Sequence, residues 1–116
     1  LEKALESDVR NYGEDHPSTA VRHSNLALVY KDLGEYEGAR SLLEKSLESD
    51  VRNYGEDHPS TAISRLNLAS VYLKLGKRKH AKSLFQNAYD TFKSFLGEEH
   101  PETRNAKEWL DGMDEE

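Results

Sequence analysis

The side chains that could do chemistry in this sequence recur in a fixed local setting. Two acidic residues precede a histidine and a proline at His16, His58 and His100, which are spaced 42 residues apart. Histidine beside carboxylates suggests metal ligation, and the alternative is that each histidine caps a helix beginning at the proline. Helices in successive units lie at least about 8 to 10 Å apart, whereas zinc ligands lie about 2 Å from the ion. We therefore favour capping and expect no metal site.

Catalysis has no support in the sequence. Serine, histidine and aspartate are abundant, but they form no arrangement of nucleophile and base, and no glycine-rich phosphate loop follows a strand. The absence of cysteine excludes disulfides, thiol redox pairs and thiolate zinc sites. We expect a protein that is not an enzyme and that has no cofactor.

Charge and length limit the partners. The 116 residues carry a formal net charge of −6 at pH 7, which argues against binding to nucleic acid or to an anionic membrane. No apolar run approaches the roughly 18 residues of a membrane span. Basic or neutral partners are electrostatically easier. The lack of cysteine suits a reducing compartment, so we expect a cytoplasmic protein, and the start at Leu1 within a repeat indicates a piece of a longer chain.

The elements that position these residues follow from an internal repeat. The octapeptide from Gly13 to Ala20 recurs unchanged from Gly55 to Ala62, and an altered third copy begins at Gly97. A period between about 20 and 50 residues is typical of a solenoid, whose units bury apolar surface only by stacking. Residues 1–20 match 43–62 at every position except Ala4 and Ser46, which indicates recent duplication or engineering. We expect a single repeat domain over 1–116, made of a second helix of a partial repeat at 1–12, repeats at 13–54 and 55–96, and a partial terminal repeat at 97–116.

Each repeat is expected to contain two helices. Apolar and small residues recur at helical spacing after Pro17 and again after Gly34. Proline suits the first helical turn, and glycine tolerates the left-handed conformation that ends helices. Short loops make sequential helices antiparallel neighbours. The predicted helices cover 1–12, 17–33, 36–53, 59–75, 78–95 and 101–111.

The run from Asn25 to Ala39, NLALVYKDLGEYEGA, resembles the tetratricopeptide repeat. The family has leucine, a small residue, tyrosine, glycine, tyrosine and alanine at these offsets. Its usual unit has 34 residues, and the longer unit here is similar to the repeats of kinesin light chains and related scaffold proteins. The resemblance implies an all-α, right-handed superhelix of antiparallel helix pairs, whose first helices line a concave peptide-binding groove.

Matching first-helix positions to the family predicts the residues of that groove. Asn25 and Asn67 are the most informative, because a side-chain amide both donates and accepts and can hold the backbone of an extended peptide. The alternative is that these amides bond within the domain. The predicted groove residues are Val21, Ser24, Asn25, Leu28, Lys31, Asp32, Ile63, Leu66, Asn67, Ser70, Leu73 and Lys74.

Three of these positions are leucines, and they have two possible roles. Leu28, Leu66 and Leu73 give the groove a partly apolar floor suited to an apolar anchor of a partner. They also have the right character to pack between neighbouring helices, which we favour for Leu66.

A basic cluster and a tryptophan stand outside the shared pattern. The cluster comprises Lys74, Lys77, Arg78, Lys79, His80 and Lys82, and it either recruits an acidic motif or is simply solvated, which we favour. Trp109 falls at the groove position of Asn25 and Asn67. Together with the acidic residues after it, Trp109 either occupies a groove of this or a neighbouring molecule or covers the apolar end of the preceding helix, which we favour.

The sequence therefore supports two function hypotheses. The first is a non-catalytic interaction scaffold that binds a peptide or protein segment in a concave groove. The second is a structural spacer or self-associating array, because uncapped solenoid ends expose core surface.

Overall fold

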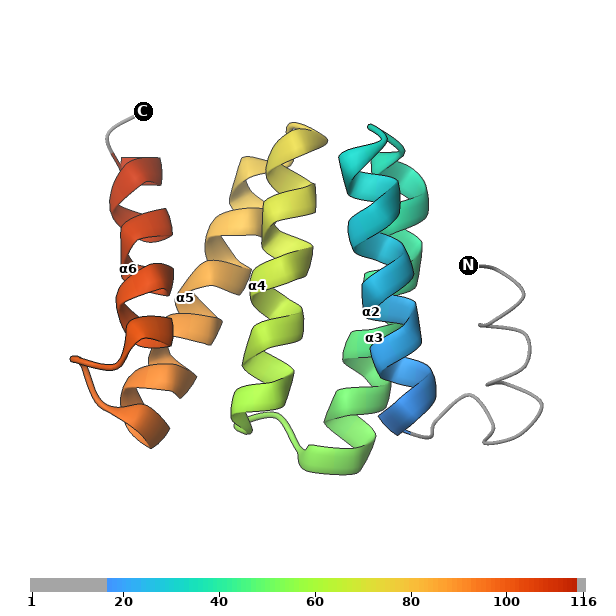
Figure 1. Ribbon diagram of the computed structural model, residues 1–116. Helices are drawn as coiled ribbons and strands as arrows, with labels where there is room; N and C mark the ends of the chain where they lie inside the picture. The colour runs from blue at the N-terminus through green and yellow to red at the C-terminus, as the bar shows by residue number, and fades with distance from the viewer. Residues whose placement is uncertain (1–16, 115–116) are drawn as a thin grey trace.

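The chain folds as a series of antiparallel helices. The computed structural model describes residues 17–114, so the helix predicted at 1–12 lies outside the described residues. The helices are α2 (Pro17–Asp32), α3 (Tyr36–Tyr54), α4 (Pro59–Lys74), α5 (Arg78–Leu96) and α6 (Pro101–Asp114). All five predicted helices in this range are confirmed. Figure 1 shows α2, α4 and α6 in one layer and α3 and α5 in a second layer behind it.

The predicted histidine caps are confirmed at the two described positions. The Nδ1 atom of His58 accepts a hydrogen bond from the backbone N–H of Ser60 at 3.0 Å. His100 does the same for the N–H of Glu102 at 3.2 Å. Each bond satisfies one of the free N–H groups of a first helical turn that begins with proline. His16 lies outside the described residues.

Glycine reverses the chain between the two helices of each pair. Gly34 and Gly76 have φ angles of 80° and 78°, in the left-handed region that other residues rarely adopt. The N–H of Gly76 bonds to the carbonyl of Leu73 at 3.1 Å, and the N–H of Lys77 bonds to that of Tyr72 at 2.9 Å. These turns satisfy the last helical carbonyls while bringing the next helix back antiparallel.

Packing joins helices that follow one another in sequence. Two apolar clusters form the core, one centred on Leu43 between α2, α3 and α4, and one centred on Phe85 between α4, α5 and α6. Alanines at Ala27, Ala39, Ala69 and Ala81 are completely buried and allow close approach of the helices. Tyr72 adds a polar link, because its hydroxyl donates to Glu44 on α3 at 3.0 Å.

The buried faces of α3 and α5, the second helices of the two repeats, differ in polarity. On α3 the buried residues include Ser46, Ser49 and Asp50. One period later, α5 has Ala88, Thr91 and Phe92 at the same positions, all of them buried. At these positions the interior of the second unit is therefore less polar than that of the first.

Candidate functional site

Two hollows lie along the layer of α2, α4 and α6. The first hollow, of about 300 Å³, opens between α2 and α4. Its lining residues are Val21, Ser24, Asn25, Leu28, Ser46, Asp50, Tyr54, Ser60, Ile63, Ser64 and Asn67. The second hollow, of about 730 Å³, lies between α4 and α6. Its lining residues are Lys31, Ser70, Leu73, Lys74, Gly76, Arg78, Asn105, Glu108, Trp109, Gly112 and Met113.

Ten of the twelve predicted groove residues line one of these hollows. The first contains Val21, Ser24, Asn25, Leu28, Ile63 and Asn67, and the second contains Lys31, Ser70, Leu73 and Lys74. Asp32 is exposed and lines neither. Leu66 is only 8% exposed and packs in the core with Phe85, which is the role favoured for it from the sequence.

Asn25 and Asn67 occupy equivalent positions on α2 and α4. Asn25 is exposed and Asn67 is half-buried, and both line the first hollow. Neither side-chain amide forms a hydrogen bond within the part of the chain that the structure describes. The backbone carbonyl of Asn67 accepts a hydrogen bond from the hydroxyl of Ser70 at 2.8 Å. The local bonding considered for these amides is thus not observed, and their donors and acceptors are open to a ligand.

The floor of the first hollow is polar. The hydroxyls of Ser24 on α2 and Ser46 on α3 form a hydrogen bond of 2.7 Å. Beside them, Ser64 on α4 donates to a carboxylate oxygen of Asp50 on α3. Burial raises the pKa of Asp50 above its usual value of 3.8, while the Ser64 hydrogen bond and the nearby His58 act in the opposite direction. These contacts tie three helices together around a buried carboxylate.

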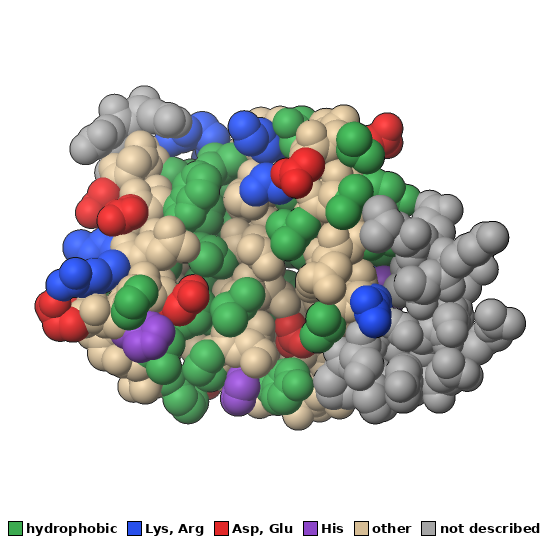
Figure 2. All heavy atoms as spheres, viewed as in Figure 1, with side chains coloured by type: hydrophobic (Ala, Val, Ile, Leu, Met, Phe, Trp, Pro, Cys, Tyr) green, Lys and Arg blue, Asp and Glu red, His purple; other side chains and the backbone are tan. Residues whose placement is uncertain are grey.

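Apolar side chains surround this polar floor. Val21, Leu28, Tyr54 and Ile63 line the first hollow and are all substantially exposed. Figure 2 shows hydrophobic side chains on this face over α2, α4 and α6, with basic side chains gathered along the upper edge, where α4 ends. An apolar rim around a few polar groups is a common composition for a binding surface.

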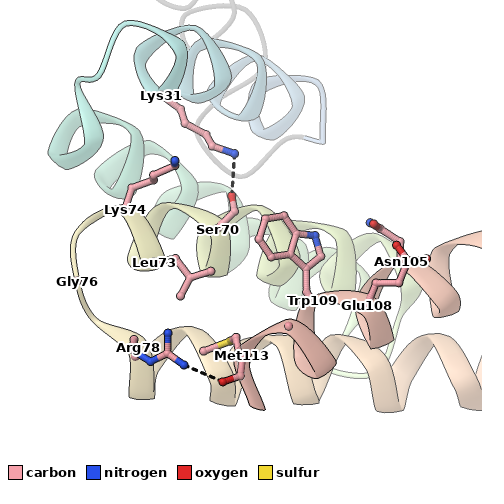
Figure 3. A pocket seen from close by; sticks show the side chains of 11 residues that line it. Lys31, Ser70, Leu73, Lys74, Gly76, Arg78, Asn105, Glu108, Trp109 and Met113 are labelled. Carbon is pink, nitrogen blue, oxygen red and sulfur yellow. Dashed lines mark hydrogen bonds between the residues drawn. The ribbon is translucent and has the colours of Figure 1, made fainter. Parts of the chain in front are cut away.

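Trp109 forms a wall of the second hollow. Its ring stacks on Phe85 with centroids 5.1 Å apart and an interplanar angle of 10°. The tryptophan nevertheless remains 40% exposed. It therefore covers a core side chain in the middle of α5 and not the apolar end of that helix expected from the sequence, where Phe95 and Leu96 stay exposed. Its remaining surface lines the second hollow near Ser70 and Leu73 (Figure 3).

Hydrogen bonds hold the edges of the second hollow. Lys31 Nζ on α2 donates to Ser70 Oγ on α4 at 3.0 Å, and Arg78 donates to the carbonyl of Met113 at 2.8 Å (Figure 3). Lys74 adds a third cationic side chain, whereas Glu108 is the one carboxylate among the lining residues. Of the basic cluster, Lys77, Lys79, His80 and Lys82 are exposed and line neither hollow, while Lys74 and Arg78 line the second.

The groove prediction missed Ser60 and Ser64 of α4, Gly76 and Arg78 at the turn into α5, and several residues of α6 and α3. Asn105, Glu108 and Gly112 lie one period after Ile63, Leu66 and Ser70, so the repeat register itself was a signal for them. Ser46, Asp50 and Tyr54 come from α3, the layer expected to lie behind the groove. They reach the first hollow because the small side chains of Ser24 and Ser64 leave space above them.

The described residues offer neither a metal centre nor a membrane span. Between residues 17 and 114, no three histidine, aspartate or glutamate side chains are placed to hold a metal ion. Over the same range, every helix is too short or too polar to cross a lipid bilayer.

Comparison with known proteins gives the family. The family model described as tetratricopeptide repeat matches residues 1–50 and 22–94. No curated protein sequence matches the chain. The fold is similar to the crystal structure of BtubC (BKLC) from P. vanneervenii, with a TM-score of 0.77, 24% identity and 84% of this chain covered. The match spans 39% of the BtubC chain. The two family matches together cover most of the chain, so this all-α solenoid belongs to the tetratricopeptide repeat family.

Proposed function

We propose that the chain is a non-catalytic scaffold that binds a peptide or protein segment along the face formed by α2, α4 and α6. Repeats of this family generally mediate protein–protein interaction. The observation that carries the proposal is the pair of unbonded amides of Asn25 and Asn67 in the first hollow. Two amides on neighbouring first helices can each donate to and accept from the backbone of one extended segment, whatever its sequence.

The surrounding surface supports the same function. Leu28 and Ile63 are about two-fifths exposed beside the two amides, and Leu73 and Trp109 continue the apolar surface into the second hollow. Apolar anchors of a partner buried in such hollows would supply most of the affinity, and the amides would set the path of the backbone.

The test is substitution of both amides. The Asn25→Ala, Asn67→Ala variant should lose peptides that the unaltered chain captures from a displayed random library, with at least about a tenfold weaker Kd. Helicity and melting temperature should change little, because neither amide has a hydrogen-bond partner among residues 17–114. Asn87→Ala is the matched control, since Asn87 is an exposed asparagine on α5 outside both hollows. Unchanged capture by the double variant would remove the groove from the proposal.

Self-association is the second candidate. Phe95 and Leu96 at the end of α5 are 58% and 37% exposed, and large exposed apolar side chains at the end of a stack favour contact with another copy. Light scattering over a concentration series separates the candidates. A mass that rises with concentration and returns to that of the monomer in a Phe95→Ser variant supports association, and a monomer at every concentration excludes it.

A further inference from the structure

Asp50 is a buried carboxylate whose nearest group of opposite charge character is His58, at the start of α4. The residue is 8% exposed on α3 and lines the first hollow. Ser64 is its hydrogen-bond donor, and no lysine or arginine pairs with it within the part of the chain that the structure describes. A charged group taken out of water with one neutral hydrogen bond is destabilising unless an opposite charge is supplied.

The fold itself does not require this carboxylate. The equivalent position one period later is Phe92, which is completely buried in the apolar core. The hydrogen-bonding partner Ser64 likewise corresponds to Ala106, and Ser24 corresponds to Leu66. The same helix pairs therefore stack with an apolar interior in the second unit. A departure from packing that lies in a hollow open to solvent indicates a role in binding.

We infer that the first hollow receives a lysine or arginine side chain of the bound segment and pairs it with the carboxylate of Asp50. The inference rests on the proposed function and adds the chemistry of the partner. Leu28 and Ile63 at the rim provide apolar surface for the aliphatic stem of such a side chain. The cationic end supplies the donors that the second oxygen of Asp50 lacks, and Asn25 and Asn67 hold the flanking backbone.

Charge directs the basic residue to this hollow and away from the other one. The second hollow is lined by Lys31, Lys74 and Arg78, which repel a cation. Among the described residues, no lysine or arginine lines the first hollow. The net charge of −6 also favours encounter with a basic segment.

The experiment compares three synthetic decapeptide libraries. All positions except one central residue are randomised, and that residue is lysine, arginine or norleucine, which keeps the aliphatic stem without the charge. The unaltered chain should retain the lysine and arginine libraries at least about tenfold more than the norleucine library. Asp50→Asn should retain all three equally. Glu48→Gln removes one exposed charge from the same helix outside the first hollow and should keep the preference.

The outcomes separate this inference from the proposed function. In one outcome, the unaltered chain retains the three libraries equally while the Asn25→Ala, Asn67→Ala variant loses all three. That result overturns the role of Asp50 and still supports binding in the groove. Retention that persists in the double variant overturns the groove, on which the inference rests. A preference for the lysine and arginine libraries that persists in Asp50→Asn, or that disappears in Glu48→Gln, overturns the pairing with Asp50.

A measurement on the unaltered chain covers the case in which Asp50→Asn does not fold. The side-chain carboxyl carbon of Asp50 should shift in the NMR spectrum when a captured lysine peptide is added. The norleucine analogue of the same peptide should leave that resonance in place. The same response to both peptides would overturn the pairing.

Discussion

The rings of Trp109 on α6 and Phe85 on α5 lie nearly parallel, with centroids 5.1 Å apart. The stack attaches the last helix to the core, because Phe85 is completely buried at the centre of the second cluster. One face of Trp109 therefore stabilises the fold while the exposed remainder is available to a partner. The two roles can be separated by substitution.

Trp109→Ala should lower the free energy of unfolding by about 2 kcal/mol, less than for a fully buried tryptophan because Trp109 is 40% exposed. Trp109→Phe should recover most of this loss, since a ring still stacks on Phe85. Urea unfolding followed by circular dichroism measures both. The comparison is Phe95→Ala, a more exposed aromatic, which we expect to change stability by less than about 0.5 kcal/mol. An equal effect of the alanine substitutions at Trp109 and Phe95 would exclude the stack as an attachment.

Asp50 should make stability depend on pH in a defined direction. Burial raises its pKa in the folded chain above the ordinary 3.8, so the folded state binds a proton more tightly than the unfolded state. Protonation of Asp50 contributes its full stabilisation at pH values below the pKa of Asp50 in the unfolded chain. This stabilisation is lost as pH rises through the pKa of Asp50 in the folded chain.

Compared with Asp50→Asn, the unaltered chain should therefore gain stability as pH falls from 7 toward 4. Urea unfolding of both chains at each pH gives the difference in their free energies of unfolding. The contributions of titrating groups distant from Asp50 are the same in both chains and cancel in this difference. Parallel curves for the two chains would show that the pKa of Asp50 is the same in the folded and unfolded states.

Removing a histidine cap should lower the stability of the fold by a modest amount. His58→Ala removes the acceptor for the N–H of Ser60 and a ring that stacks on Tyr54 with centroids 4.8 Å apart. We expect about 1 kcal/mol of destabilisation, with partial recovery in His58→Asn, which can still cap. Thermal unfolding with and without zinc or a chelator also tests the metal interpretation. A melting temperature that depends on zinc in the unaltered chain and not in His58→Ala would favour ligation over capping.

Two glycines give opposite predictions for the same change. Gly76→Ala should destabilise by about 1 to 2 kcal/mol, because φ is 78° although no atom lies within 4 Å of the added Cβ. Gly112 is inside α6 and also has open space around it. Gly112→Ala should stabilise by about 0.5 to 1 kcal/mol, since alanine is the better helix former. Chemical denaturation of the two variants measures both effects, and a loss of stability in Gly112→Ala would contradict the helical geometry of α6.

The fold was largely predictable because the residues that start and end its helices are of characteristic types and recur in each repeat. Pro59 and Pro101 open helices, histidines cap them, and glycines close them at nearly the positions expected. The helix predicted to end at residue 111 continues to Asp114, because Leu110 and Met113 both bury against α5 and carry the helix through Gly112. Tertiary packing outweighs the low helix propensity of glycine here.

The candidate site was only partly predictable, because a position on a first helix does not show how deeply its side chain is buried. The family register placed Asn25, Asn67 and Leu73 on the concave face, and the structure puts them in hollows. Whether a position is floor or core depends on the sizes of several neighbours at once. The small Ser24 leaves room for the buried Asp50 to line the first hollow, whereas Leu66 at the equivalent position is buried in the same apolar cluster as Phe92.

The packing of each helix mainly against its neighbours in sequence also has a kinetic consequence. Forming any one hairpin closes only a short stretch of chain, so the entropy lost before contacts form is small. We expect folding to begin at one hairpin and to propagate outward, with relaxation times in the microsecond to millisecond range typical of helical domains of low contact order. The apolar hairpin of α4 and α5 is the natural nucleus, and the polar unit around Asp50 should be the part that opens first.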